Sequence, residues 1–312
     1  MRFPLRSLTR PLLAAALLVL VGVPGAALGA SPDTASAPTQ VGTLQVERHG
    51  DRGRSVILIP GLEGGTWVWK DTIAHLQQNH VVYAVTLAGF DGVPAPASGG
   101  QLFDQANASL LRLIREHKLD KPVLVGHSLG GTLALRLAGE HAALLGGVVA
   151  VDGLPVFPGM ERVDAAQRTA MAAQMQTQMA AMTPEQFAAQ ARGYMQNVGV
   201  LDAQLAARLA PLNARSDVKA SAQYMAEVLA FDGRAGLRQA DLPILEISPY
   251  NAPDYTHPPM VMSEGQKTAY YQGLLADAPN AKVVSISPAR HYVMFDQPVK
   301  FQQTLDAFLQ SL

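Results

Sequence analysis

The chain has 312 residues, of which 48% are hydrophobic and 16% are charged, and it contains no cysteine. The 24 Lys and Arg residues nearly balance the 25 Asp and Glu residues, which argues against a nucleic-acid-binding protein, since such proteins normally carry a basic excess. The lack of cysteine excludes disulfides, thiolate metal sites and a cysteine nucleophile.

The first thirty residues have the organisation of a secretory signal peptide. Arg2, Arg6 and Arg10 precede an almost wholly apolar run over residues 11–23, and small residues follow up to position 30. We therefore expect residues 1–30 to be a signal peptide, residues 31–41 to be a flexible leader, and the protein to be exported to the periplasm or secreted. An uncleaved anchor is the alternative, but the run is short for a bilayer span, so we expect no stable membrane span after signal removal.

Short apolar segments that are typical of strands alternate with helical patterns along the rest of the chain. Strands are expected at residues 44–48, 55–59, 81–87, 122–125, 148–151, 243–247 and 282–286, and helices at 67–76, 102–117, 129–141 and 299–312. The first two strands are expected to be joined by a turn over residues 49–53. This alternation predicts an α/β fold with a mostly parallel sheet that is covered by helices on both faces.

One long segment breaks the alternation. Residues 154–240 contain no convincing strand and are rich in Ala, Gln and Met, and Thr183 begins a capping-box pattern that ends at Gln186. We expect this segment to be an all-helical lid insertion. The α/β core would then consist of residues 42–153 and 241–312.

The segment Gly126-His127-Ser128-Leu129-Gly130 matches the G-x-S-x-G pattern of a nucleophile elbow. It follows an expected strand and precedes an expected helix, which is the context that the pattern requires. A sharp turn there would expose the Ser128 hydroxyl, and only very small residues fit two positions before and after it, as Gly126 and Gly130 do. The turn would also aim the Leu129 amide and the helix N-terminus at a developing oxyanion.

Together with this elbow, the segments IPGLEGGTWVW, VTLAGFDG, VVAVDGLP and ARHYVMFDQP resemble the α/β-hydrolase superfamily, in its lid-bearing bacterial branch, over about residues 42–312. The resemblance implies an α/β-hydrolase fold with about eight strands and an inserted helical lid. It also implies a catalytic triad in the chain order Ser, acid, His, and no cofactor.

A serine hydroxyl needs an adjacent base, and the resemblance places that base in the loop before the last helix, where His291 lies. Two residues compete for the acid that would orient it. Asp152 ends an expected strand and Asp254 follows a later one, after a loop longer than the usual tight turn. The choice between them is close to even, with a slight preference for Asp152 and with Asp254 as the alternative. The histidines show no metal-binding spacing, so no metal site is expected.

Acyl transfer also needs two preorganised amide donors for the oxyanion. The Leu129 amide is one candidate. The other would come from the loop that follows the strand at 55–59, where the Leu62 amide is the best candidate. The family usually has His-Gly at this turn, whereas Pro60 stands here in place of the His.

A serine nucleophile with a histidine base implies attack on a carbonyl group. Dehalogenases and epoxide hydrolases of this fold carry Asp at the nucleophile position, so Ser128 argues against both. We expect a serine esterase that acts on a small to medium, ester-like small molecule through an acyl-enzyme. A lactonase or C–C bond hydrolase with the same triad is the alternative enzyme. A non-catalytic ligand-binding protein on a hydrolase scaffold is the alternative from another class.

Overall fold

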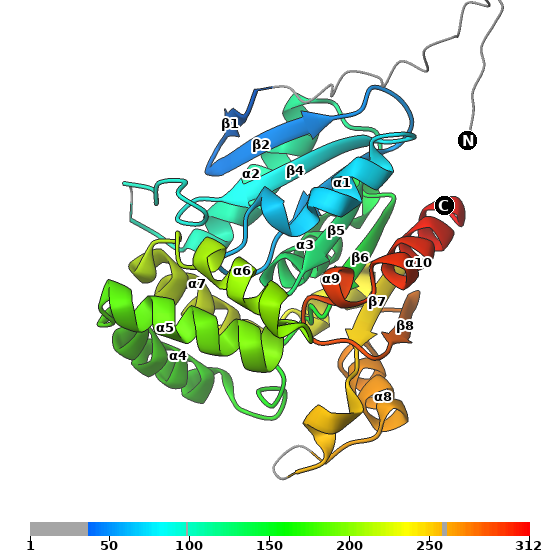
Figure 1. Ribbon diagram of the computed structural model, residues 1–312. Coiled ribbons are helices and arrows are strands. Elements are labelled where there is room, and N and C mark those ends of the chain that lie inside the picture. The colour runs from blue at the N-terminus through cyan, green and yellow to red at the C-terminus, as the bar shows by residue number, and fades with distance from the viewer. Residues whose placement is uncertain (1–36, 98, 258–260) are drawn as a thin grey trace, which may run out of the picture. The chain divides into compact units, whose positions relative to one another are not determined.

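The structure is a computed structural model that describes residues 37–97, 99–257 and 261–312. Its centre is an eight-stranded sheet with the strand order β1-β2-β4-β3-β5-β6-β7-β8 (Figure 1). The strands are β1 (Thr39–Val41), β2 (Leu44–His49), β3 (Ser55–Ile59), β4 (Val81–Leu87), β5 (Val123–His127), β6 (Gly147–Val151), β7 (Ile244–Pro249) and β8 (Ala281–Ile286). Strand β2 runs antiparallel to both of its neighbours, and the pairs from β4 to β8 are parallel. The expected mostly parallel sheet of about eight strands is therefore confirmed.

Ten α-helices surround this sheet in the described part of the chain. They are α1 (Lys70–Leu76), α2 (Leu102–Glu116), α3 (Leu129–His141), α4 (Ala165–Ala180), α5 (Pro184–Tyr194), α6 (Ala203–Asn213), α7 (Val218–Ala230), α8 (Glu264–Leu274), α9 (Val293–Asp296) and α10 (Pro298–Gln310). Each of the helices expected from the sequence has a counterpart among them, with boundaries that differ by a few residues.

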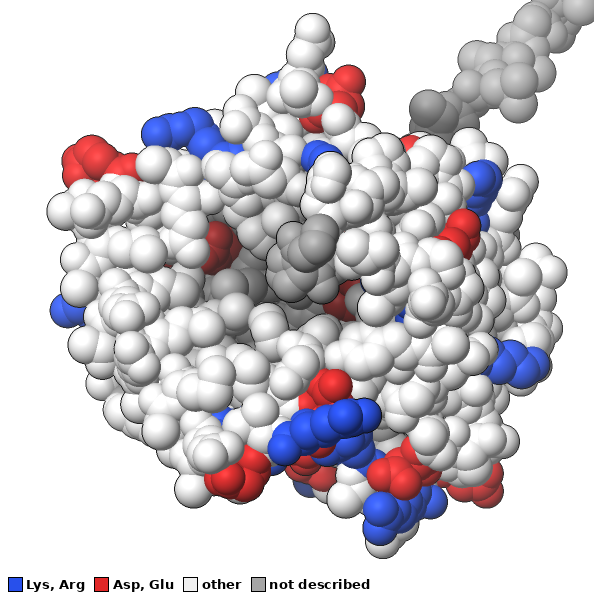
Figure 2. Space-filling view, turned by 90° about the horizontal axis from the view of Figure 1, so that it is seen from below, with Lys and Arg blue, Asp and Glu red and all other residues white. Residues whose placement is uncertain are grey.

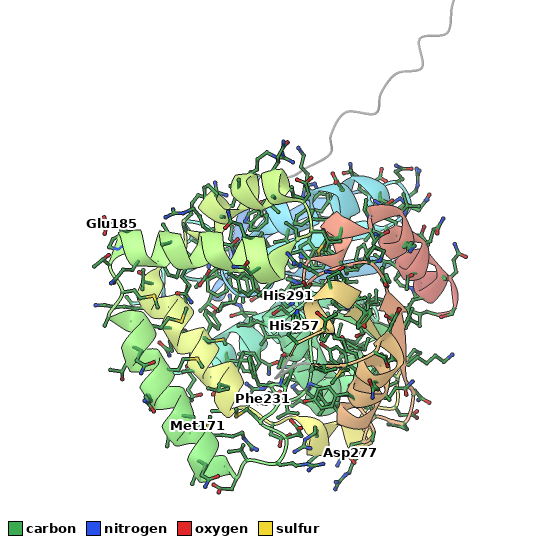
Figure 3. The ribbon with its side chains drawn as sticks, turned by 60° about the horizontal axis from the view of Figure 1, so that its bottom comes forward. Met171, Glu185, Phe231, His257, Asp277 and His291 are labelled. Atoms are coloured by element: carbon green, nitrogen blue, oxygen red, sulfur yellow. The ribbon has the colours of Figure 1, made fainter. Side chains whose placement is uncertain are left out.

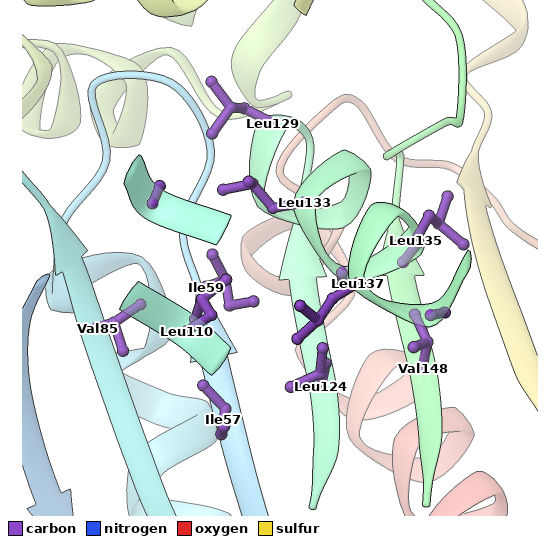
Figure 4. Packing of buried hydrophobic residues seen from close by; sticks show 14 of the residues in the cluster. Ile57, Ile59, Val85, Leu110, Leu124, Leu129, Leu133, Leu135, Leu137 and Val148 are labelled. Atoms are coloured by element: carbon purple, nitrogen blue, oxygen red, sulfur yellow. The ribbon is translucent and has the colours of Figure 1, made fainter. Parts of the chain in front are cut away.

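The hydrophobic core forms two layers, one on each face of the sheet. Successive residues of β3 alternate between the layers, because neighbouring side chains of a strand point to opposite faces. Ile57 and Ile59 pack with helices α2 and α3, as the close-up in Figure 4 shows, whereas Val56 and Leu58 pack with helices α1 and α10. Both faces of the sheet are thus covered by helices, as a parallel sheet requires. Because side chains on both faces are buried, the strands appear in the sequence as continuous apolar runs.

Helices α4 to α7 form one continuous insertion between β6 and β7, which we call the insertion helices. Figure 1 shows them gathered in green and yellow-green beside the sheet, apart from α8. Thr183 caps α5 with the expected capping box. At the base of the insertion, Val156 pairs with Asp232 in an isolated bridge, and the Gly233 amide donates to the Pro155 carbonyl at 2.7 Å. Helices α4 to α7 lie within the expected segment 154–240, while its bounds as an insertion and its action as a lid stay predictions.

One expectation near the start of the described chain needs correction. Residues 39–41, which were assigned to a flexible leader, form strand β1 because they pair with β2 at the sheet edge. The strands β2 and β3 are joined by a short turn, as expected, and β4 lies between them in the sheet. The signal peptide expected over residues 1–30 lies outside the described residues. Within the described part, no helix has both the length and the apolar character needed to cross a membrane.

Candidate active site

The turn that carries Ser128 joins β5 directly to α3. Ser128 has a φ of 52° and a ψ of −120°, outside the regions that non-glycine residues favour. Its amide donates to the Val151 carbonyl at the end of β6, at 2.9 Å. The residue remains partly exposed, whereas its neighbours on either side are buried. The expected sharp turn between a strand and a helix thus agrees with the local geometry, and the backbone of Ser128 is strained there.

The glycines on either side of Ser128 occupy positions without room for a side chain. A Cβ on Gly126 would lie 2.1 Å from the Gly130 carbonyl oxygen, and a Cβ on Gly130 would lie 2.3 Å from the Ile59 carbonyl oxygen. Both distances are far below van der Waals contact. The turn is therefore as tight as the sequence pattern predicted.

The His291 ring meets the carboxylate of Asp152. Nδ1 of His291 lies 2.5 Å from Oδ2 of Asp152, and both side chains are largely buried, with 14% and 13% exposed. Asp152 directly follows β6, and His291 lies in the loop between β8 and α9. Residues 139 positions apart in the chain are thus brought together at the carboxyl ends of parallel strands, where ligands bind in open α/β sheets.

His127, next to the serine, links the elbow to the loop of His291. Its Nε2 lies 3.1 Å from the His291 carbonyl oxygen, and the centroids of the two imidazole rings are 4.5 Å apart. The ring is fully buried, and this burial lowers the pKa of His127 well below its ordinary value. A neutral imidazole whose Nε2–H donates to that carbonyl fits these contacts. His127 therefore packs beside the elbow and holds the loop of His291.

Asp254, the alternative acid, is hydrogen-bonded to Arg290 and Asn251. Its two carboxylate oxygens accept hydrogen bonds from the Arg290 guanidinium at 2.7 and 2.8 Å, and the Asn251 amide donates to one of them at 2.9 Å. The hydrogen bonds from Arg290 lower the pKa of Asp254 below its ordinary value. Of the two acids, the structure brings Asp152 to the His291 ring and pairs Asp254 with the neighbouring arginine.

Sequence reasoning missed two residues of α8 that support Asp152. The Tyr271 hydroxyl donates to Oδ1 of Asp152 at 2.5 Å, and the buried Lys267 donates to the Pro249 carbonyl with its ammonium 5.0 Å from the Tyr271 ring centre. Burial would raise the pKa of Asp152, but the Lys267 charge and the hydrogen bonds from His291 and Tyr271 outweigh burial and lower it. The spacing of four residues places Lys267 and Tyr271 on one helix face, but this spacing alone does not distinguish a role at the site from ordinary packing.

The turn after β3 lies directly against the elbow. A Cβ on Gly61 would be 3.0 Å from Cβ of Ser128, and the Gly64 amide donates to the Gly61 carbonyl at 3.0 Å. Within the described residues, the Leu62 amide in this turn has no hydrogen-bond acceptor, and Leu129 provides the first amide of α3. The two expected oxyanion donors thus lie on segments that pack against the serine from two sides.

The insertion helices also reach His291. Its amide donates to the Val198 carbonyl at 3.1 Å, and the Tyr194 ring at the end of α5 lies edge-on to the imidazole, with centroids 5.9 Å apart. Figure 3 places His291 between the insertion helices and the segment that carries α8. The face shown in Figure 2 is hollowed, and acidic side chains are visible in the hollow. Among the described residues, no group of three His, Asp or Glu side chains is arranged to hold a metal ion.

Comparison with known proteins shows the family of the chain. A family model described as the alpha/beta hydrolase family matches residues 56–303. The chain therefore belongs to the alpha/beta hydrolase family. Its sequence is 32% identical over 107 residues to "Probable lysophospholipase BODYGUARD 4" of Arabidopsis thaliana, a match that covers 33% of this chain and 25% of that protein. The curated relatives match over 25% to 42% of their own length.

Solved structures resemble the chain over most of its length. The enol-lactonase from Burkholderia xenovorans LB400 superposes with a TM-score of 0.67 and 18% identity, covering 86% of this chain and 96% of that one. The esterase EaEST from Exiguobacterium antarcticum gives a TM-score of 0.67 and 16% identity, covering 86% and 95%. At these identities the likeness shows a shared fold.

Proposed function

We propose that this protein is a serine hydrolase that cleaves carboxylic esters of small to medium size through an acyl-enzyme intermediate. The observation that carries the proposal is the 2.5 Å contact between Nδ1 of His291 and Asp152, in a loop tied through His127 to the strained turn at Ser128. Membership of the hydrolase family supports it, because the fold implies a small-molecule substrate.

In the proposed mechanism, the Asp152 carboxylate keeps the imidazole proton on Nδ1, which leaves Nε2 of His291 as the base. Oγ of Ser128 bonds to the ester carbonyl carbon while its proton passes to Nε2. The tetrahedral intermediate then expels the alcohol, which takes that proton, and leaves the acyl group on Ser128. Water, deprotonated by His291, releases the acid by the same steps.

The amides of Leu62 and Leu129 are proposed to donate to the oxyanion of both tetrahedral intermediates. Support comes from the turn at Gly61, which packs against Ser128, and from the position of Leu129 at the N-terminus of α3. A helix N-terminus carries a partial positive charge, so it adds to the stabilisation. Each such donor typically contributes about 2.7–4 kcal/mol to the transition state.

Turnover of 4-nitrophenyl butyrate tests the proposal. We expect Ser128→Ala to lower kcat by at least about a thousandfold. A fluorophosphonate should label Ser128 of the wild type, forming the Oγ–P bond with loss of fluoride. The matched control is Ser311→Ala at the exposed C-terminus, which should keep full activity. Activity that survives Ser128→Ala would refute the proposal, and a panel of lactones and anilides tests the ester preference.

We propose that the insertion helices act as a lid over this site. The Tyr194 ring beside His291 and the hydrogen bond to Val198 support this role. Tyr194→Ala should therefore change the acyl-chain preference among 4-nitrophenyl esters from acetate to octanoate. An unchanged preference would contradict the proposal.

Export by the expected signal peptide over residues 1–30 is also proposed, from the basic, apolar and small segments in that order. Fractionation of cells that express the full chain should place the protein outside the cytoplasm with its N-terminus shortened. Deletion of residues 2–30 should retain it inside. Equal distribution of both forms would contradict export.

A further inference from the structure

Two polar side chains of strand β7 are buried without partners beside the proposed catalytic acid. Glu246 is 0% exposed and Ser248 is 1% exposed. Among the described residues, neither carboxyl oxygen of Glu246 has a hydrogen-bond partner, and neither does Oγ of Ser248. Burying a carboxyl group costs stability unless hydrogen bonds compensate, so a buried acid in the middle of a sheet requires a physical explanation.

The register of the sheet places both residues next to Asp152. Glu246 pairs with Ala150 of β6, and the Asp152 amide donates to the Ile247 carbonyl at 2.9 Å. Side chains two positions apart in a strand point to the same face, so Glu246 and Ser248 share a face of β7. Neighbouring strands lie only about 5 Å apart, so the long Glu246 side chain can reach the end of β6, which Asp152 follows.

Helix α8 covers this face of the sheet. Ser285 of β8 lies on the same face and donates to Glu264 at the start of α8, at 2.7 Å. Further along α8, the Tyr271 hydroxyl donates to Asp152. Glu246 is therefore enclosed between the sheet and α8, in the same buried layer as the proposed acid.

The enclosed layer holds one cation for two carboxyl groups. The groups that face Glu246 are Asp152 at the end of β6 and Lys267 and Tyr271 on α8, whereas β8 presents the apolar Val283 opposite it. Burial and then the Asp152 charge raise the pKa of Glu246 well above its ordinary value, and the Lys267 charge and nearby amides lower it by less. One cation balances one carboxylate, so Glu246 remains the neutral acid.

We propose that Glu246 is a positioning residue of the proposed catalytic triad, and that its neutral carboxyl group is linked to the Asp152 carboxylate by an internal water molecule that Ser248 also binds. Buried polar groups without protein partners are normally satisfied by ordered water, and such a water needs two to four polar partners. These three side chains supply them. Asp152 is then held from the sheet as well as from α8, which fixes its orientation toward His291. This inference rests on the proposed serine hydrolase function and deepens it.

Infrared spectra and a crystal structure test the neutral acid and the water. At neutral pH, Glu246→Gln should remove the band of a protonated carboxyl group from the wild-type spectrum. Glu116→Gln, at the exposed end of α2, is the matched control and should remove only a carboxylate band. A high-resolution crystal structure of the wild type should show a water oxygen within hydrogen-bond distance of Glu246, Ser248 and Asp152. Loss of a carboxylate band from Glu246→Gln, or a crystal structure without this water, would overturn the proposal.

Turnover of 4-nitrophenyl butyrate separates positioning from packing. Glu246→Leu should lower kcat about tenfold with KM unchanged, while its thermal midpoint stays equal or rises because no carboxyl group is buried. Glu246→Gln keeps a donor and should retain kcat within about threefold of the wild type. Full kcat in Glu246→Leu would show that the side chain only fills space.

The proton on Nδ1 of His291 gives a readout that needs neither turnover nor a folded Glu246→Leu variant. Its far-downfield NMR resonance should move in Ser248→Ala, because Asp152 loses part of its support. Ser221→Ala removes another buried hydroxyl without a partner, in α7, and should leave the resonance in place. An unmoved resonance in Ser248→Ala would overturn the link to Asp152. Failure of the hydrolase assignment is distinguishable, because Ser128 would then resist the fluorophosphonate while the infrared band and this resonance could still be measured.

Discussion

The Tyr271 hydroxyl and the Asp152 carboxylate are joined by a 2.5 Å hydrogen bond at Oδ1, the oxygen that His291 does not use. The carboxylate is thus held at both oxygens, from α8 and from the loop before α9. Its orientation toward the imidazole depends on a helix that follows it by more than a hundred positions.

Tyr271→Phe removes this hydrogen bond and keeps the ring. We expect kcat for 4-nitrophenyl butyrate to fall about tenfold with KM unchanged, because a less fixed carboxylate orients the imidazole less well. Tyr270→Phe, on the neighbouring residue whose hydroxyl contacts Glu161 and the Gly159 amide, is the control and should retain activity. A loss that appears only in KM would argue against the positioning role.

The two acids give a direct comparison. Asp152→Asn should lower kcat by about 10⁴-fold, because the amide favours the wrong imidazole tautomer. Asp254→Asn should weaken only the pairing with Arg290 and change kcat by less than about tenfold. The measurement is steady-state turnover of both variants, with thermal melting to verify folding. A larger loss for the Asp254 variant would reverse the assignment of the acid.

Glu63 should make stability fall as the pH rises. Its pKa is raised from 4.5 to about 8 in the folded protein, so between these values the folded state holds a proton that the unfolded state has released. Stability therefore declines across this window, and Glu63→Gln should remove that decline. We expect the variant to gain about 1–3 kcal/mol more over the wild type at pH 8 than at pH 5 in urea unfolding. A gain that is equal at both pH values would show that the carboxyl titrates normally.

The elbow glycines should tolerate no side chain. Gly126→Ala would bring Cβ to 2.1 Å from the Gly130 carbonyl oxygen, so we expect a loss of about 3 kcal/mol or more in unfolding free energy, or failure to fold. Gly193→Ala in α5 meets no atom within 4 Å and should be neutral or stabilising by up to about 1 kcal/mol. Similar stabilities for the two variants would mean that the elbow relaxes more easily than its geometry indicates.

The candidate nucleophile could be predicted from sequence because its requirements are local. The strand, the turn and the helix around Ser128 are contiguous, and the two glycines stand at fixed distances from it. The sheet was predictable for a similar reason, since strands buried on both faces give continuous apolar runs.

The acid could not be chosen with the same certainty, because its identity depends on which loop end meets His291 in space. Asp152 and Asp254 both follow strands, and only the tertiary arrangement pairs one with the imidazole and the other with Arg290. Tyr271 was missed because a tyrosine on an amphipathic helix has no sequence feature that distinguishes a buried hydrogen bond from ordinary packing. Strand β1 was missed because three residues carry too little periodicity.

The pairing of Val156 with Asp232, together with the bond from Gly233 to Pro155, closes the base of the insertion helices. The chain leaves the sheet after β6 and returns toward β7 at nearly the same place, so the insertion helices form one continuous segment. Such a segment can be lengthened, shortened or exchanged while the strands of the sheet keep their register. Replacement of this segment would also remove the Val198 carbonyl that accepts a hydrogen bond from the His291 amide, so a replacement must supply that contact again to keep the His291 loop in place.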